Sequence, residues 1–116
     1  MSYVSGFVLP VPVANKEAYI ATAKRAWPLF KEYGAVATYE CWGDNVPEGK
    51  VTSFPMAVQL EEGEAVVFSW IVWKDKASAE KCFASSQTDP RWKEMMDMPF
   101  DGKRMIWGSF EPIFQM

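Results

Sequence analysis

The chain has 116 residues, a length typical of one folded unit, so we expect a single domain over residues 1–116. Its formal net charge is −3 and it has no run of Lys or Arg, which argues against a nucleic-acid partner because phosphate binding needs clustered basic side chains. No stretch reaches the roughly 20 apolar residues of a membrane span, and residues 1–7 do not read as a signal peptide. We therefore expect a cytoplasmic protein without a membrane partner.

Two residue counts restrict the chemistry. The chain contains no His, which excludes a Ser-His-Asp or Cys-His nucleophile and also His-ligated zinc, haem or non-haem iron. Cys41 and Cys82 are isolated and lack the spacing of a metal site, so we expect two reduced thiols. No Gly-rich phosphate loop or dinucleotide fingerprint is present. We therefore expect no metal site and no cofactor.

The first third of the chain predicts a strand, a helix and a second strand. Tyr3–Leu9 alternates as a strand does, and Pro10 is expected to close it because proline removes a ladder donor. Residues 15–33 carry apolar side chains every three or four positions, which predicts an amphipathic helix with Asn15 as its N-cap. Residues 35–43 predict the second strand.

The middle of the chain contains a loop and a weaker extended segment. Residues 44–50 are polar and rich in turn formers, which predicts a loop. Residues 51–59 look extended, and Pro55 restricts them to an edge strand or a bulge. We expect this segment to form a hairpin with the strand that follows.

Residues 64–74, EAVVFSWIVWK, predict the central strand because they are rich in β-branched and aromatic residues. Side chains of a strand alternate between its two faces. One face then carries Val67, Ser69, Ile71 and Trp73, and the other carries Val66, Phe68, Trp70 and Val72. Both faces are mostly apolar, so this strand needs cover on both sides.

The last third predicts two helices and a strand. Residues 75–87 read as a helix with Asp75 as its cap, and Asp89-Pro90 starts a short helix. The apolar side of that short helix consists of Trp92, Met95 and Met96. Residues 100–103 form a turn, and residues 104–114 predict the last strand.

This order of elements predicts a ferredoxin-like α+β sandwich, in which an antiparallel sheet carries helices on one face. The other face of the sheet would then be bare and apolar, whereas monomers seldom expose more than a few hundred Å² of contiguous apolar surface. We therefore expect a two-fold homodimer that packs sheet to sheet and buries at least about 1,200 Å² in total.

Five segments resemble the YbaA-like family of unknown function, DUF1428, over nearly the whole chain. They are residues 3–12 (YVSGFVLPVP), 52–55 (TSFP), 66–71 (VVFSWI), 89–91 (DPR) and 98–106 (MPFDGKRMI). The resemblance implies the dimeric α+β barrel superfamily, in agreement with the expected dimer, and it brings no assigned activity. Relatives in that superfamily include antibiotic-biosynthesis-type monooxygenases, muconolactone-isomerase-like enzymes and haem-degrading or dye-decolourising proteins. Many use a His, which this chain lacks, and they bind substrates between the helices and the sheet.

The polar candidates for catalysis are Glu40, Asp101 and Arg104. In a structural interpretation, Asp101 caps a turn, Lys103 is solvated, and Arg104 pairs with Glu40 or a carbonyl group. In a functional interpretation, Arg104 and Lys103 orient an anionic or carbonyl-bearing substrate, while Glu40 or Asp101 acts as acid or base.

The six Trp residues and an aromatic content of 16% fit either a bulky core or an aromatic-lined ligand pocket. The candidates for ligand binding are Tyr39, Ser53, Phe54, Ser69, Trp70 and Lys103. We hypothesise a homodimer that binds a small hydrophobic or aromatic metabolite, with cofactor-free chemistry of the monooxygenase or isomerase kind. The alternative is a non-enzymatic ligand sensor or a protein-interaction module, because a fold alone does not fix a function.

Overall fold

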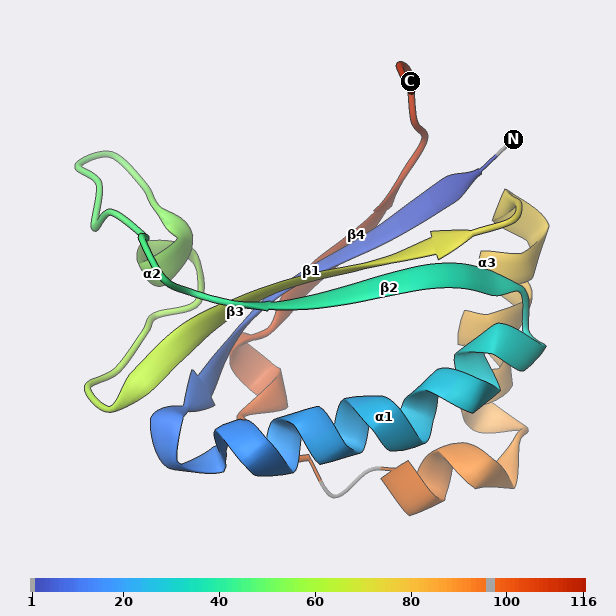
Figure 1. Ribbon diagram of the computed structural model, residues 1–116, viewed down its shortest axis with the longest axis horizontal. Coiled ribbons are helices and arrows are strands. Elements are labelled where there is room, and N and C mark those ends of the chain that lie inside the picture. Colours follow the sequence, from blue (N-terminus) through green and yellow to red (C-terminus); the bar gives the residue numbers. More distant parts are fainter. Residues whose placement is uncertain (1, 96–97) are drawn as a thin grey trace.

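Four antiparallel strands form one sheet in the computed structural model, which describes residues 2–95 and 98–116. The strands are β1 (Tyr3–Pro12), β2 (Ala35–Trp42), β3 (Glu64–Trp73) and β4 (Ile106–Phe110), in the spatial order β2-β3-β1-β4. The two longer helices, α1 (Lys16–Glu32) and α3 (Lys76–Ala84), lie on the same face of the sheet (Figure 1). This βαββαβ arrangement confirms the predicted ferredoxin-like sandwich.

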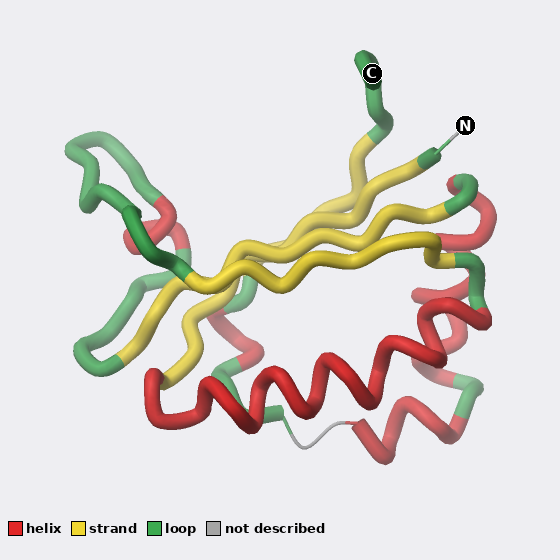
Figure 2. Tube along the Cα trace, in the orientation of Figure 1, coloured by secondary structure: helices red, strands yellow, loops and turns green. Residues whose placement is uncertain are grey.

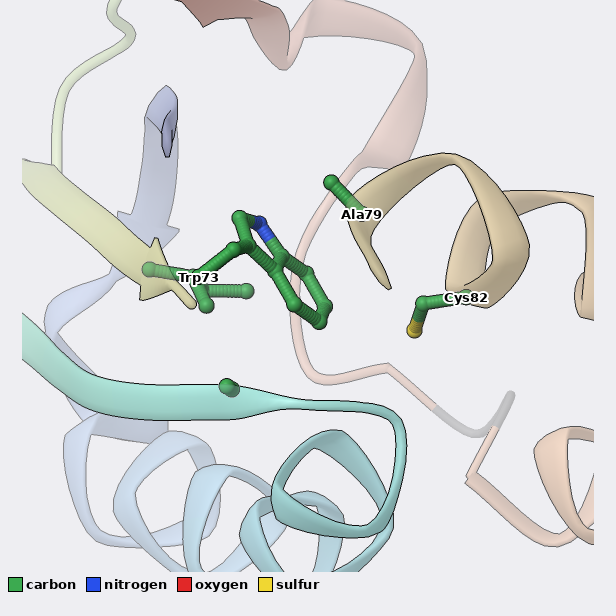
Figure 3. Packing of buried hydrophobic residues seen from close by; sticks show 5 residues of the cluster. Trp73, Ala79 and Cys82 are labelled. Atoms are coloured by element: carbon green, nitrogen blue, oxygen red, sulfur yellow. The ribbon is translucent and has the colours of Figure 1, made fainter. Parts of the chain in front are cut away.

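The core lies between the sheet and its helices, on what we call the covered face. β3 is central because it pairs with both β1 and β2, and its alternate side chains point toward α1 and α3. Trp73 is fully buried at the end of β3, where it packs toward Ala79 and Cys82 of α3 (Figure 3). The Trp73 indole donates a hydrogen bond from Nε1 to Ser5 Oγ at 3.1 Å, so the buried polar atom is satisfied.

The opposite side of the sheet, which we call the open face, carries little cover. The single-turn helix α2 (Phe54–Ala57) and the residues after it cover one end, where Val58 packs on Val8 and Val66. Over the rest of this face the large side chains keep access to solvent. They are Tyr39, Phe68, Trp70, Ile106 and Phe110, which the strand register places on one side of the sheet. Figure 2 shows the two longer helices, α1 and α3, on the other side of the sheet.

The extended segment predicted at residues 51–59 is wrong, because Phe54–Ala57 form α2 instead. Ser53 Oγ accepts a hydrogen bond from the Met56 backbone N–H at 3.1 Å, and Pro55 lies in the first turn of the helix. A serine cap followed at once by proline favours a helix start, which here prevails over the extended pattern. Gln59 then takes a positive φ of 49° that ends the segment.

The predicted end of β1 at Leu9 is also wrong, since the strand continues through Pro10 and Pro12. β4 pairs with Val4–Val8, so beyond Val8 no strand of the described residues lies beside this edge of β1. Proline is tolerated there because a free edge does not require a backbone donor. Because the pairing with β1 involves Ile106–Phe110 alone, the last strand is shorter than the predicted residues 104–114.

The helix boundaries agree with prediction apart from one cap. α1 begins after Asn15, but the Asn15 side chain donates from Nδ2 to the Pro99 carbonyl at 3.0 Å and does not cap the helix. Asp75 caps α3 as predicted, accepting from the Ser78 N–H at 2.8 Å. The short helix after Asp89 is a 3-10 helix, Pro90–Met95, and the predicted contribution of Met96 falls outside the described residues. Further 3-10 turns occur at Val13–Asn15, Ser85–Gln87 and Gly102–Arg104.

Within residues 2–95 and 98–116, no helix has the length and apolar character needed to cross a membrane.

Candidate functional site

A cavity of about 160 Å³ lies between α1 and the covered face of the sheet. Its walls come from β1, α1, β2, β3 and the segment that precedes β4, and most of the side chains are aromatic or aliphatic. They are Phe7, Leu9, Tyr19, Thr22, Ala23, Ala26, Trp27, Phe30, Thr38, Glu40, Ser69, Ile71, Met98, Phe100 and Met105. An apolar cavity with a few convergent polar groups is the usual form of a small-molecule site.

Tyr19 and Glu40 form the main polar contact in this cavity. The apolar stripe of α1 directs Tyr19 onto the sheet, where the residue is buried and its hydroxyl needs a partner. Tyr19 Oη donates to Glu40 Oε1 at 2.6 Å, a short contact between a hydroxyl and a carboxylate. The buried Ser69 lies directly opposite Glu40 in the β2–β3 register and lines the same cavity.

Burial raises the pKa of both members of this pair. Burial, and then the negative charge of Glu40, hold the pKa of Tyr19 well above its usual value, so Tyr19 keeps its proton and remains a donor. Glu40 as a whole residue keeps access to solvent, yet its carboxyl group lies against Tyr19 and Ser69. Loss of water around that carboxyl raises the pKa of Glu40, and the hydrogen bonds from Tyr19 and Ser69 oppose the increase. Glu40 is therefore a stronger base than a fully hydrated carboxylate.

Two further hydroxyls of the cavity are already paired with the backbone. Thr22 Oγ1 donates to the Ala18 carbonyl at 3.0 Å, and Thr38 Oγ1 donates to the Trp70 carbonyl at 3.0 Å. No Lys or Arg side chain is among the described residues that line the cavity. Besides the Trp27 indole, the described side chains that line the site therefore offer a bound molecule one carboxylate and two hydroxyls, from Tyr19 and Ser69. Across residues 2–95 and 98–116, the structure contains no cluster of three or more Cys, Asp or Glu side chains suited to a metal ion.

Two of the predicted site residues lie elsewhere, in an ion cluster built around Arg104. The guanidinium binds Glu64 in a bidentate manner, with Nη1–Oε1 and Nη2–Oε2 distances of 2.7 Å. It also donates from Nε to Asp101 Oδ2 at 3.0 Å and from Nη1 to the Gln59 carbonyl at 3.0 Å. The hydrogen bond from Arg104 lowers the pKa of Glu64 and that of Asp101. Arg104 thus pairs with a carbonyl, as the structural interpretation expected, but its carboxylate partners are Glu64 and Asp101 and not Glu40.

Asp101 accepts a hydrogen bond on Oδ1 from the Lys103 backbone N–H at 3.0 Å, which is the turn cap that the structural interpretation expected. Lys103 itself is exposed. Neither residue lines the cavity beside Glu40. The structure therefore separates Lys103 and Arg104 from Glu40, and it keeps Asp101, the other predicted acid or base, beside Arg104.

The remaining ligand-binding candidates lie on or near the open face, on the other side of the sheet from the cavity. Tyr39 stacks on Trp70 with ring centroids 4.9 Å apart. Phe54 contacts Phe68 at 5.8 Å between centroids, and Ser53 is occupied as the cap of α2. Of the nine candidates named from the sequence, the structure brings Glu40 and Ser69 together at the cavity.

The sequence interpretation treated Tyr19 as one member of an apolar stripe and did not name it as a site residue. The available signal was its hydroxyl, which a buried tyrosine must pair with another polar group. Met98, Phe100 and Met105 were also missed, because they line the cavity from an irregular segment without a repeating pattern. Their position depends on how the chain returns to β4.

The sequence matches the family "Protein of unknown function (DUF1428)" over residues 2–102. The chain belongs to the DUF1428 family. A relative, "Uncharacterized protein YbaA" of Escherichia coli K12, is 54% identical over 114 residues, and the alignment covers 97% of each chain. These matches confirm the resemblance found in the sequence.

The fold of this DUF1428 protein is similar to that of solved structures with little sequence identity. SnoaB of Streptomyces nogalater, described as a cofactor-independent oxygenase, aligns with a TM-score of 0.61 at 13% identity over 99% of this chain and 96% of its own. A protein from an uncultured marine organism, described as a dimeric ferredoxin-like protein, aligns with a TM-score of 0.61 at 13% identity over 99% and 98% of the two chains. These likenesses confirm the ferredoxin-like fold of the chain.

Proposed function

We propose that this protein binds a small, neutral aromatic metabolite in the cavity between α1 and the sheet, and that Glu40 acts there as a general base without a cofactor. The observation that carries the proposal is the Tyr19–Glu40 hydrogen bond of 2.6 Å in an otherwise largely apolar cavity. A carboxylate with a raised pKa in a concave apolar site is a typical feature of acid–base catalysis.

The size of the cavity suits a ligand of one or two fused rings. Its volume of about 160 Å³ is close to that of an engineered apolar cavity of about 150 Å³ that binds benzene. Trp27 and Phe30 of α1 and Phe100 on the returning chain supply aromatic walls for a planar molecule.

The charge of the site determines which ligands are excluded. Glu40 faces the cavity, and Arg104 and Lys103 lie outside it, so an anionic ligand would meet a like charge without a cation to offset it. A neutral molecule with a weakly acidic O–H or C–H group would instead donate to the Glu40 carboxylate. The proposal therefore favours the carbonyl-bearing or phenolic ligand over the anionic one.

In the proposed reaction, Glu40 removes one proton from the ligand and the electron pair is delocalised over the aromatic system. Tyr19 holds Oε1 in place through its hydrogen bond, and the other oxygen of Glu40 can receive the proton. Return of that proton to a different carbon gives an isomer. Alternatively, a ligand CH2 group reacts with O2 to give a C=O group and water, with all electrons supplied by the ligand. The description of SnoaB as a cofactor-independent oxygenase supports the second course by analogy of fold.

The proposal includes a homodimer that packs open face to open face. The support is the row of exposed apolar side chains on that face, together with the description of a structurally similar protein as dimeric. A stable interface of this kind buries at least about 1,200 Å² in total. A light-scattering mass of one chain at micromolar concentration would contradict it.

A cytoplasmic location is also part of the proposal and is in keeping with the free thiols of Cys41 and Cys82.

Ligand binding is tested by titrating the protein with 2-naphthol, naphthalene and 2-naphthoate while Trp fluorescence is recorded. We expect 2-naphthol to bind at least tenfold more tightly than 2-naphthoate. Ala26→Leu, which fills the cavity, should weaken 2-naphthol binding at least tenfold. The matched control is Ala21→Leu on the exposed side of the same helix, which should leave binding unchanged. Equal binding of the anion, or no effect of Ala26→Leu, would contradict the proposed site.

A non-enzymatic ligand sensor is the second candidate, because the cavity offers one base and, in Tyr19, a donor whose pKa is too high for ready proton release. The enzyme and the sensor differ in whether the protein transfers a proton to or from the bound ligand. We expect the protein to speed the loss of deuterium from carbon 1 of bound 2-naphthol, and Glu40→Gln to abolish that increase. Binding of 2-naphthol without faster exchange would favour the sensor and contradict the enzyme.

A further inference from the structure

A second cavity of about 160 Å³ adjoins the first one, between the start of α1 and the end of β2. Lys16, Ile20 and Trp42 are among its lining residues, together with Tyr19 and Glu40. Tyr19 and Glu40 also line the first cavity. The hydrogen-bonded pair is therefore a wall that the two cavities share.

The two cavities follow one another along the groove between α1 and the sheet. On β2, Trp42 lines the second cavity, Thr38 lines the first, and Glu40 between them lines both. On β3, Val67 lines the second cavity and Ile71 lines the first. Figure 1 shows α1 running below β2 along this groove. Without the shared wall, the two cavities would form one longer space.

The wall is held firmly in place. Tyr19 Oη donates to Glu40 Oε1 at 2.6 Å, which closes the groove between helix and strand. The Tyr19 ring belongs to a buried cluster with Leu9 and Val67, and it meets the Phe100 ring edge-on with the centroids 5.7 Å apart. Rotation of Tyr19 out of the groove would lose both the hydrogen bond and these ring contacts.

The second cavity has a surface that suits an aromatic ring. Trp42 supplies an indole face, and the Lys16 ammonium lies 5.2 Å from the centroid of that ring. A neutral ring placed beside them would find an aromatic partner and a cation, both of which attract π systems. The wall, and not an unsuitable lining, is therefore what keeps an aromatic ligand out of this cavity.

We propose that Tyr19 is a specificity-determining residue, because the wall that it forms with Glu40 closes off the second cavity and so sets the length of the ligand. The inference rests on the proposed function, in which a ligand hydroxyl donates to Glu40, and it adds the shape of that ligand. The hydroxyl must lie at one end of the ring system, since rings on both sides of it would collide with Tyr19. 2-Naphthol has this shape, whereas 9-phenanthrol carries its hydroxyl on the middle one of three fused rings.

The test is isothermal titration calorimetry of the full chain and its variants with 2-naphthol and 9-phenanthrol. We expect the parent to bind 9-phenanthrol at least tenfold more weakly than 2-naphthol. Tyr19→Ala joins two cavities of equal size, so it should bind 9-phenanthrol at least tenfold more tightly than the parent does. Circular dichroism checks folding. If Tyr19→Ala does not fold, Tyr19→Leu takes its place with the same expectation, because leucine keeps part of the packing on Leu9 and Val67.

A further substitution distinguishes a joined groove from a mere loss of bulk at position 19. Ile20→Trp, added to Tyr19→Ala, fills the second cavity from α1 and should abolish the gain in 9-phenanthrol affinity. It should change 2-naphthol affinity less than threefold. The matched control is Ala21→Trp in the same background, which should keep the gain because Ala21 is exposed and lines neither cavity.

Failure of this inference and failure of the proposed function give different results. A parent protein that does not bind 2-naphthol overturns both. A parent that binds 2-naphthol and 9-phenanthrol equally well overturns the length limit alone. A folded Tyr19 variant without the gain, or a gain that survives Ile20→Trp, overturns the role of Tyr19 and leaves the proposed ligand site intact.

Discussion

Replacing Tyr19 by Phe removes the hydroxyl that donates to Glu40 Oε1 at 2.6 Å and keeps the ring that packs against Phe100. The carboxylate then loses a charge-assisted hydrogen bond while it stays in the same partly buried position. A hydrogen bond to a charged group contributes about 1.5–3 kcal/mol when it is well buried. Because Glu40 keeps some access to solvent, we expect Tyr19→Phe to lower the free energy of unfolding by about 1–2 kcal/mol at neutral pH. For a chain of this length, that corresponds to a decrease in melting temperature of about 4–8 °C.

The effect should depend on pH in a definite direction. The hydrogen bond from Tyr19 lowers the pKa of Glu40, so its loss raises that pKa further above the ordinary value. A carboxyl whose folded-state pKa is raised holds its proton more tightly in the folded state. Stability therefore falls as the pH rises from the unfolded-state pKa through the folded-state pKa, and it falls further in Tyr19→Phe. The difference between the variant and the parent should be small near pH 4 and largest above pH 7.

The assay is urea unfolding of both proteins at a fixed concentration, at pH 4 and pH 8. The control is the same substitution in a Glu40→Gln background, where residue 40 carries no charge. There the loss of stability caused by Tyr19→Phe should be the same at both pH values. A Tyr19→Phe protein as stable as the parent at pH 8 would refute the reasoning. An equal loss at pH 4 and pH 8 would show that the hydroxyl acts by packing and not through the carboxylate.

The other predictions concern residues inside and outside the site. Glu40→Gln should increase stability above pH 7 in urea unfolding, because it removes a desolvated charge and keeps an acceptor for Tyr19; a decrease would contradict the assigned burial cost. Arg104→Met should lower stability at pH 7 and leave 2-naphthol affinity unchanged. The difference in stability between Arg104→Met and the parent should shrink as the pH falls through the lowered pKa of Glu64. Loss of 2-naphthol binding in a folded Arg104→Met protein would instead assign Arg104 to the site. Burial raises the pKa of Cys82 to about 12, so a thiol reagent at pH 8 should spare Cys82 until urea is added; modification of Cys82 as fast in the folded protein as in urea would contradict this.

The parts of the fold that could be predicted from the sequence are those with a strong repeating pattern. The unbroken apolar run of β3 predicted a central strand, and the spacing of three and four predicted α1. Asp75 was a correct cap because its partner, the Ser78 N–H, lies one turn ahead in the same helix. Such signals depend on neighbours in the chain and need no knowledge of the tertiary structure.

The errors occurred where tertiary contacts decide the local structure. Pro10 lies within β1 because β4 is too short to pair with that end of the strand, which no local pattern of β1 indicates. Asn15 was expected to accept a capping hydrogen bond from α1, but it makes no such bond, and its side-chain nitrogen donates to the Pro99 carbonyl, 84 positions away. Arg104 was expected to pair with Glu40 or a carbonyl; it does bind the Gln59 carbonyl, but the return of the chain to β4 places Glu64 and not Glu40 beside it.

The candidate site could be predicted only in part, because tertiary contacts also decide which residues meet there. Glu40 and Ser69 could be named as polar residues on apolar strands, and the β2–β3 register places them opposite each other. The partner of Glu40 could not be named, because Tyr19 reaches it only after α1 packs across the sheet. The cavity depends further on Phe100 and Met105, whose segment has no regular pattern.

The most direct test of the central proposal is a crystal structure of the protein with 2-naphthol bound. We predict that the ring system lies between α1 and the sheet against Trp27 and Phe30, with its hydroxyl within hydrogen-bond distance of a Glu40 carboxylate oxygen. Naphthol bound on the open face, or a cavity closed by side chains at saturating ligand, would contradict the assignment of this cavity as the site.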